Sequence, residues 1–464
     1  MFLILRGVSD SCWQAILANS AGRVSSIAEA AGGMSLHRSL VTVVFFLAGV
    51  VFADTPAPLI PSTPAGHTLR LWLVAFNSGD RERIDTFDKT YADWVPLEWV
   101  ARVRAQTGGY DLLRIETSRE RDVIFRVKEK AGFHEAIGRI QVSTTNPPHI
   151  TELGLFPVPP GAKYEEVTLD AAARARVLDD VANIIEASYV FPDVAKAMAS
   201  SLRARELRGE YKAIVDGETF ASTLTEDLRE VSHDKHIEVR FSFVVQPLGE
   251  ITKNSEPDPM LRRQLAATNC GFEKAEHLPP NIGYLKFNVF ADPEICAPTA
   301  IAALNSLADS DALIIDLRDN NGGLSGMVTL IASYLFAEPT HLNDAYDRAS
   351  NTTRQFWTSS EVSGTKFIYK PVFLLTSKKT FSAAEAFSYA LKDLKRATLI
   401  GETTGGGAHP VEPHRIDDHF SIIVPFARSI SPITKTDWEG TGVEPDIRVP
   451  AANALEEALK RARH

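Results

Sequence analysis

The sequence predicts an α/β core that is preceded by a helical subdomain and a small α+β domain. In residues 283–464, apolar runs of strand length alternate with helical patterns, which is the order of a sheet covered by helices. Residues 165–240 place apolar side chains at helical spacing, and residues 241–282 connect this part to the core. Residues 66–160 begin with a helical pattern and continue with strand patterns. A length of 464 residues fits two or three domains of ordinary size.

Continuous or alternating apolar runs define the core strands. Five strands are predicted, at 283–290, 312–317, 372–376, 397–400 and 421–424. Helical patterns at 324–336 and 383–394 lie between them. This order predicts a sheet with helices packed on its faces.

The two preceding parts are predicted from the same kind of periodicity. The helical subdomain has three apolar helix faces, formed by Val177, Val181, Ile184 and Ile185, then by Val194, Met198 and Leu202, then by Phe220, Leu224, Leu228 and Val231. The small domain has a helix that ends near residues 78–79 and strands at 124–127, 136–142 and 150–156. It weakly resembles the nuclear-transport-factor-2-like fold, and we interpret it as a binding or packing module.

The N-terminal residues are predicted to be a signal peptide. Residues 34–53 combine a short polar start, an uncharged apolar run and small residues before a cleavage point, which is typical of export. A retained membrane anchor is the alternative, although the run is short for a bilayer span. Residues 1–33 fit neither role, so Met34 is the expected start. Residues 54–65 are proline-rich and are predicted to be a linker, as is 157–163.

Composition narrows the class of protein. The chain is 44% hydrophobic and 23% charged, as in a packed globular protein, and its net charge of −10 disfavours a nucleic-acid partner. Removal of residues 1–53 would leave two of the three cysteines, Cys270 and Cys296. In an exported protein this pair predicts either a disulfide or two buried thiols.

The most informative stretch is TSKKTFSAAE at residues 376–385. A buried strand ends, a polar turn follows, and Ser382 opens a helix. At a helix start, unpaired N–H groups and the positive end of the dipole favour developing negative charge, and the N–H of Ala383 could act as an oxyanion donor. Serine is also a preferred N-cap residue, so a purely structural role is the alternative.

Three further stretches carry candidate residues. The sequence DLRDNNGG at 316–323 ends a buried strand with two glycines, and a plain turn is the alternative to a ligand-binding loop. The sequence VSHDKHI at 231–237 holds two histidines beside an aspartate, although a lone surface histidine is usually inert. The turn-rich sequence WEGTGVEPD at 438–446 holds Glu439.

Together these stretches resemble a family of serine peptidases. The matching segments, in order, are YVFPDVAKAM, DKHI, DLRDNNGG, TSKKTFSAAE, IGETTGGGAHP and WEGTGVEPDI. They resemble the tail-specific, C-terminal processing proteases and the tricorn core, and most closely the branch shared with interphotoreceptor retinoid-binding protein. The resemblance spans about 165–460. It implies a crotonase- or ClpP-like peptidase core with a helical cap subdomain.

The resemblance also implies roles for individual residues. Ser382 matches the nucleophile of the family. The N–H of Ala383 and a glycine of the pair Gly322 and Gly323 match the oxyanion hole.

A base and an acid complete the predicted triad. His236 matches the histidine of a short Asp-x-His motif, and a neutral imidazole with a pKa near ~6.5 can take the serine proton. Glu439 matches the acidic residue before a Gly-Val-x-Pro-Asp turn and would orient the histidine. His409 is the alternative base.

Two departures from the family pattern are visible. The C-terminal processing enzymes place a lysine about 25 residues after the serine, where this chain has Gly407. A Ser–Lys dyad at that spacing is therefore absent, and the tricorn-type Ser–His–Glu set remains. The stretch between residues 241 and 283 is also too short for a PDZ domain, which makes recognition of a substrate C-terminus by such a domain doubtful.

These observations predict an exported serine peptidase, periplasmic or extracellular, that acts on a peptide or protein through an acyl-enzyme. The alternative is a non-catalytic, retinoid-type binder of a hydrophobic ligand, and a third reading is an esterase or amidase with the same triad. No cofactor or metal is expected, because the sequence has no metal-binding cluster, Walker loop or dinucleotide fingerprint. No nucleic-acid partner and no stable membrane insertion after signal cleavage are expected.

Overall fold

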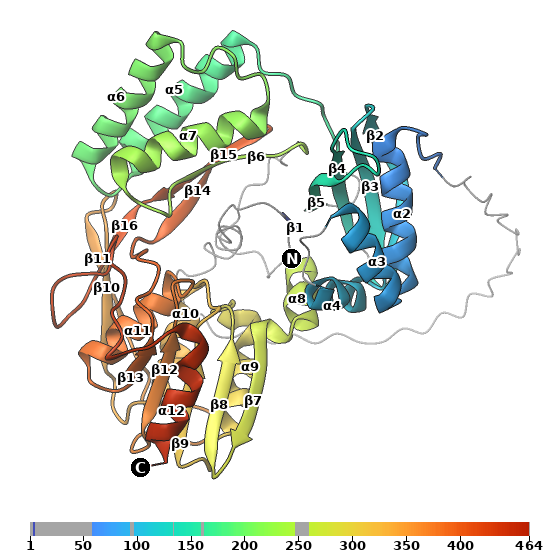
Figure 1. Cartoon of the computed structure of the whole chain (residues 1–464). Helices are drawn as coiled ribbons and strands as arrows, with labels where there is room; N and C mark the ends of the chain where they lie inside the picture. The colour runs from blue at the N-terminus through green and yellow to red at the C-terminus, as the bar shows by residue number, and fades with distance from the viewer. Residues whose placement is uncertain are drawn as a thin grey trace, which may run out of the picture. The chain divides into compact units, whose positions relative to one another are not determined.

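The computed structural model describes residues 3–4, 58–92, 97–132, 134–158, 162–245 and 259–463 (Figure 1). Residues 3–4 and 58–162 belong to one compact unit, and residues 163–463 belong to the other. The predicted signal peptide, residues 34–53, lies outside the described residues. Within the described ranges, no helix is both long and apolar enough to cross a membrane.

The first unit is an antiparallel sheet with three helices. The helices are α2 (Pro64–Ser78), α3 (Arg81–Tyr91) and α4 (Leu97–Thr107), and the strands are β2 (Tyr110–Ser118), β3 (Asp122–Glu129), β4 (Glu135–Val142) and β5 (Ile150–Val158), with β1 (Leu3–Ile4) beside β5. Helix α2 ends at Gly79, which adopts a left-handed conformation that favours glycine. Its Phe76 ring stacks on the ring of Tyr110 with 5.3 Å between centroids, which fixes the helix to the sheet. The sequence predicted α2 and the last three strands but missed α3, α4 and the half-exposed β2.

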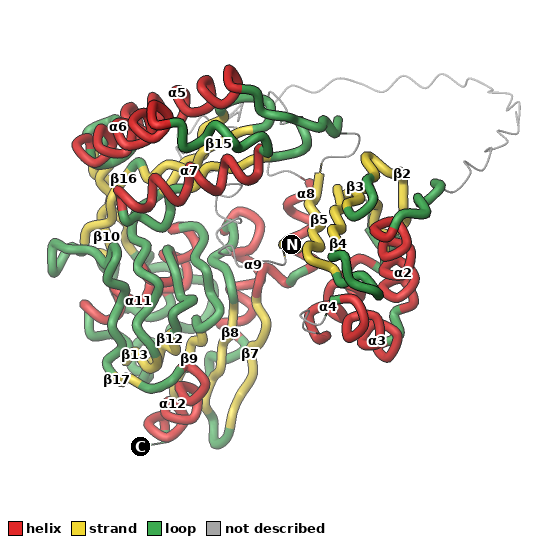
Figure 2. Tube along the Cα trace, turned by 45° about the horizontal axis from the view of Figure 1, so that its top comes forward, coloured by secondary structure: helices red, strands yellow, loops and turns green. Residues whose placement is uncertain are grey.

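The second unit starts with the three predicted helices, α5 (Ala171–Ser188), α6 (Pro192–Arg208) and α7 (Gly217–Ser232). Their apolar faces form one buried cluster. A three-stranded antiparallel sheet in the order β14 (Val411–Arg415), β15 (Phe420–Pro425), β6 (Glu238–Phe241) completes this cluster. Figure 2 shows β15 beside the helices α5 and α7. Phe420, Ile422 and Val424 of β15 pack into it.

The position of β15 differs from the prediction. The strand at 421–424 was expected in the core sheet, but it pairs with β6 and covers the helices instead. Its apolar run correctly indicates a buried strand. Burial alone does not identify the partner strand, which here comes from the segment directly after α7.

The core is a six-stranded sheet in the order β17-β13-β12-β9-β8-β7. Its strands are β7 (Phe272–Leu278), β8 (Ile282–Phe287), β9 (Ala312–Asp316), β12 (Val372–Thr376), β13 (Thr398–Gly401) and β17 (Ile447–Arg448), and all are parallel except β7. Leu313, Ile315 and Leu374 face the layer of α9 (Pro293–Asn305), α10 (Ser325–Ser333) and α11 (Ala383–Asp393). Ile314 and Leu375 face α12 (Ala454–Ala462) on the other side. The α/β core with helices on both faces is thus confirmed.

The remaining elements of the second unit flank this core. They are α8 (Pro259–Ala267), before the sheet, and a three-stranded sheet in the order β11 (Thr352–Trp357), β10 (His341–Asp347), β16 (Ala427–Ile430). Because β9 and β12 are parallel neighbours, the loops after them leave the sheet at the same edge. These loops carry the glycine pair and Ser382.

Cys270 and Cys296 form a disulfide, with 5.7 Å between their Cα atoms. The bond joins the segment before β7 to α9, and both cysteines are buried in the core cluster. Of the two possibilities that the sequence left open, the structure therefore has the disulfide.

We expect reduction of this disulfide to lower the free energy of unfolding by about 2–4 kcal/mol, because the bond closes a loop with a sequence separation of 26 residues. Denaturant titration with and without a reductant measures the difference. A double variant, Cys270→Ala with Cys296→Ala, is the control and should not respond to reductant. Equal stability of the oxidised and reduced wild type would contradict the prediction.

Candidate active site

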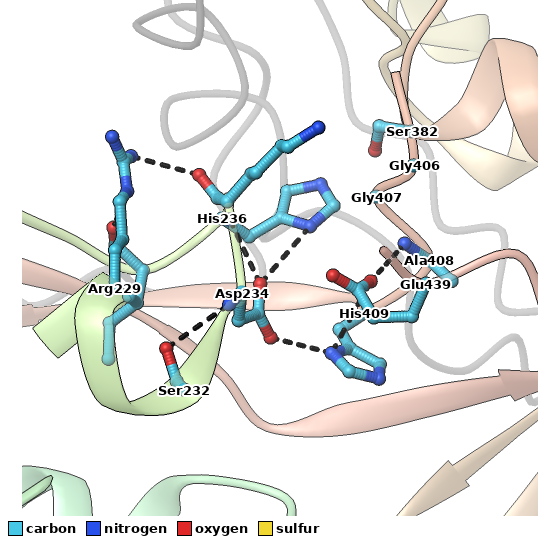
Figure 3. A network of polar contacts seen from close by, with 12 residues as sticks. Arg229, Ser232, Asp234, His236, Ser382, Gly406, Gly407, Ala408, His409 and Glu439 are labelled. Atoms are coloured by element: carbon cyan, nitrogen blue, oxygen red, sulfur yellow. Dashed lines mark hydrogen bonds and ion pairs between the residues drawn. The ribbon is translucent and has the colours of Figure 1, made fainter. Parts of the chain in front are cut away.

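The turn that carries Ser382 is strained. Ser382 lies between β12 and α11 with φ 54° and ψ −118°, a conformation that favours glycine and costs a non-glycine residue about 1–3 kcal/mol. The preceding residue, Phe381, donates its N–H to the carbonyl oxygen of Asn320 at 3.0 Å, which ties the turn to the loop after β9. The strand–turn–helix arrangement thus presents a half-buried serine at the N-terminus of a helix, the geometry of a nucleophile elbow (Figure 3).

A buried carboxylate holds this turn in place. Glu385, in the first turn of α11, is fully buried and accepts four hydrogen bonds. The donors are the Thr404 hydroxyl at 2.5 Å and the N–H groups of Gly406, Gly407 and Ser382 at 2.6, 2.8 and 2.8 Å. Burial raises the pKa of Glu385 to about 7, although the four donors act in the opposite direction. One side chain therefore connects the serine to the glycine-rich loop after β13.

His236 reaches the site from the segment between α7 and β6. Its side chain is only 4% exposed and packs on the Phe381 ring, with 4.7 Å between centroids. Among the described residues, neither ring nitrogen of His236 has a hydrogen-bond partner. Burial lowers its pKa to about 4, against the opposing effect of Asp234, so the imidazole is neutral at physiological pH.

Gly407 makes room for this histidine. A Cβ atom at position 407 would lie 2.6 Å from Cε1 of His236 and 2.3 Å from Cζ of Phe381. No side chain fits there without displacing the ring. In Figure 3 the His236 ring lies between Asp234 and the part of the glycine loop that passes near Ser382.

The acidic groups are arranged differently from the expectation that Glu439 lies directly behind His236. The carboxylate beside the His236 ring is that of Asp234, with 3.8 Å between Oδ1 and Nδ1. Glu439 instead accepts the N–H of Ala408 at 2.5 Å and lies 3.5 Å from Nδ1 of His409. His409 pairs with Asp234 at 2.6 Å, so it stands between the two carboxylates.

Asp234, His409 and Glu439 are also the one group of side chains in the described ranges whose ligand atoms could together hold a metal ion, because these atoms lie within 4.8 Å of one another. The contact of 2.6 Å between His409 and Asp234 already satisfies both groups as an ion pair. The arrangement is therefore explained by the protein's own charges.

The glycine pair lies beside the serine turn. The N–H of Gly322 donates to Oδ1 of Asn320 at 2.9 Å. Gly323 has φ 133°, and a Cβ there would lie 2.2 Å from the carbonyl oxygen of Phe290. Both a left-handed backbone and close backbone contact thus require glycine at position 323.

The chain matches the models of two related protein-family domains. Residues 281–449 match the model of peptidase family S41, and residues 166–268 match the model of the N-terminal domain of this family in eukaryotic interphotoreceptor retinoid-binding protein. The chain belongs to peptidase family S41. The predicted family resemblance is thereby confirmed.

Several curated S41-type peptidases are similar to the chain. Carboxyl-terminal-processing peptidase 1 of Arabidopsis thaliana is 28% identical over 41% of this chain and 38% of its own length. The carboxyl-terminal-processing protease of Synechocystis is 30% identical over 36% of this chain and 37% of its own length. The chain thus matches less than half the length of these relatives.

Solved structures show similarity at low identity. A lipoprotein from Streptococcus agalactiae aligns with a TM-score of 0.46 and 15% identity, covering 64% of this chain and 99% of its own. The photosystem II D1 C-terminal processing protease aligns with a TM-score of 0.37 and 16% identity, covering 61% of this chain and 94% of its own.

The structure brings Ser382, His236, His409, Glu439 and the glycine pair into one region from five separate loops of the S41 chain. Sequence reasoning missed the role of Glu385. The signal was present, because Ser-x-x-Glu at a helix start is the pattern of a capping box, in which the glutamate reaches back to the backbone of the serine.

We expect Glu385→Gln to destabilise the S41 chain by about 2–4 kcal/mol, because an amide nitrogen would face two of the four donors and leave them unsatisfied. Thermal unfolding measures the loss. Glu402→Gln is the matched control, since this half-buried glutamate lies in the neighbouring loop but outside the cluster around Ser382. Equal stability of both variants would show that the four hydrogen bonds do not hold the loop.

Proposed function

We propose that this S41 chain is an exported serine peptidase that hydrolyses peptide bonds through an acyl-enzyme intermediate. The observation that carries the proposal is a strained serine at a helix N-terminus beside a buried, neutral histidine, which packs on the ring of the residue before the serine, Phe381. We expect peptide or protein substrates, which agrees with the names of the relatives. Export depends on residues 34–53, whose sequence is typical of a signal peptide.

The reaction proceeds in two halves. The Oγ of Ser382 attacks the scissile carbonyl carbon while His236 takes the hydroxyl proton. His236 then gives this proton to the leaving amine, and the acyl-serine ester remains. A water molecule, deprotonated by the same imidazole, attacks the ester and releases the new carboxylate with Ser382 restored.

The protonation states favour His236 over His409 as the base. Burial disfavours the charged form of His409, but its hydrogen bond to Asp234 and the charge of that carboxylate outweigh burial and raise the pKa. The raised pKa favours the protonated form of His409, and a protonated histidine cannot accept a proton from serine. His236 is neutral and has unoccupied ring nitrogens, so it fits the base role.

Backbone N–H groups supply the proposed oxyanion hole. Ala383 is the first residue of α11, so its N–H lies at the positive end of the helix dipole. Of the glycine pair, Gly322 already donates to Asn320. We therefore assign the second donor to Gly323. Glu439, the acidic member of the predicted triad, reaches His236 through His409 and Asp234.

We expect a fluorophosphonate to label Ser382, because the reagent requires a serine that is activated by a base and an oxyanion hole. Ser382→Ala should abolish both labelling and peptide hydrolysis and leave the protein folded. Ser388→Ala is the matched control, because this serine lies on the same helix with its hydroxyl bonded to the carbonyl oxygen of Ala384. A folded wild type that resists the probe but takes up an apolar ligand would favour the binding protein instead.

The pH profile should follow His236. Because burial lowers the pKa of His236 to about 4, we expect kcat/KM to persist below pH 6 and to fall only as the pH approaches 4. An unperturbed histidine would lose activity below about pH 6.5. Peptide hydrolysis measured between pH 4 and 8 distinguishes the two, and a half-maximal point near 6.5 would contradict the effect of burial.

A further inference from the structure

A buried series of polar groups runs from the base to Glu439. Asp234 is 1% exposed, and its Oδ1 accepts the backbone N–H of His236 at 2.9 Å and lies 3.8 Å from the ring. Its Oδ2 pairs with Nδ1 of His409 at 2.6 Å and accepts the Tyr189 hydroxyl at 3.2 Å. His409 is 4% exposed and continues the series to Glu439 at 3.5 Å (Figure 3). Asp234 therefore contacts the base, and Glu439 reaches it only through two intermediates.

The series joins two parts of the S41 chain. Asp234 and His236 follow α7 and belong to the helical cap subdomain, whereas His409 and Glu439 come from loops of the core. Lys235 lies between the two cap residues. Its ammonium group donates a hydrogen bond to the carbonyl oxygen of Gly405, in the same core loop as His409. The loop with His409 therefore meets the cap segment with the base at several points.

The role of His409 follows from the charge of the Asp234 carboxylate beside His236. A lone buried carboxylate next to His236 would stabilise the imidazolium form and so raise the pKa of the base before the reaction. A charged His409 on the opposite oxygen neutralises that carboxylate in the resting state. The pKa of Asp234 is lowered by His409 and His236 despite burial, and the pKa of His409 is raised by its hydrogen bond to Asp234 despite burial, so the charged form is favoured for both members of this pair. Burial and the charge of Asp234 raise the pKa of Glu439 to about 7.

The titratable and charged groups that face the ion pair come from both parts of the chain. They are Tyr189, Arg229, Asp234 and His236 on the cap side, and Asp437 and Glu439 on the core side.

We propose that His409 is a positioning residue of the peptidase: it holds the Asp234 carboxylate against His236 and neutralises it, so that His236 starts each cycle unprotonated. The inference rests on the proposed function. When His236 takes the serine proton, the new imidazolium lies beside Asp234, which stabilises it at the moment it forms. Glu439 orients His409 from the far side and affects the base only through it.

The test compares His409→Gln with His409→Lys. Glutamine removes the cation, so the acid limb of the kcat/KM profile should move upward by about one to two pH units. Lysine restores a positive charge beside Asp234 and should keep the acid limb near that of the wild type, even at lower kcat. A purely structural role would lower activity by the same factor at every pH. An unshifted limb in a folded His409→Gln variant would overturn the proposal.

Two measurements keep the outcomes separate. Fluorophosphonate labelling of wild-type Ser382 tests the proposed function by itself, so failure there is distinguishable from an unshifted limb in an enzyme that is labelled. If neither His409 variant folds, Asp234→Asn and Glu439→Gln replace them. We expect a loss of about 10²–10⁴ in kcat for Asp234→Asn and a smaller loss for Glu439→Gln, and the reverse order would also overturn the proposal. His414→Gln, on β14 with Nε2 of the histidine 3.0 Å from Oε1 of Glu412, is the matched control and should leave the profile unchanged.

Discussion

The Glu385 carboxylate is the interaction on which the rest of the site depends. It accepts the N–H of Ser382 and the N–H groups of Gly406 and Gly407, and so fixes the strained serine turn and the glycine loop to each other. The glycine loop in turn affects the positions of His236 and His409. Gly407 leaves the space that the His236 ring occupies, and the same loop continues to His409. Four hydrogen bonds to one buried group thus offset the cost of a positive φ at the nucleophile.

Two separate parts of the chain must meet for the chemistry to work. Ser382 and the proposed oxyanion donors lie at one edge of the parallel sheet, because the loops after neighbouring parallel strands leave on the same side. The proposed base, His236, comes from the cap. The two parts share the buried strand β15, which lies between core loops in sequence but pairs with β6 beside the cap helices. The position of His236 near the serine turn therefore depends on a strand that the core provides to the cap.

The sequence predicted the features that depend on local patterns. Ser382 follows an apolar strand and opens a helix, and the four strands β8, β9, β12 and β13 and the three cap helices appear as clear periodicities, so these were found. The core strands β7 and β17 and the helices α9 and α12 were missed. The sheet to which 421–424 belongs, and the order of Asp234, His409 and Glu439 around the base, depend on contacts between residues far apart in the chain. Composition and spacing carry no information about which carboxylate lies beside His236. Glu385 is an intermediate case, since its capping pattern was local but its contacts with the glycine loop were not.

The buried pair of Asp234 and His409 is better explained by the proposed reaction than by a contribution to stability. Removing two charges from water costs several kcal/mol per ion, and apolar side chains of similar size often stabilise a protein as well or better. This ion pair lies between cap and core, and Asp234 turns one carboxylate oxygen toward His236 and the other toward His409. Such an arrangement suits proton transfer. A base must be neutral before proton transfer and stabilised as a cation after it. A carboxylate alone stabilises the cationic form of the base, and a cation alone favours its neutral form. The pair provides both effects, because the carboxylate lies next to the base and the cation lies behind the carboxylate.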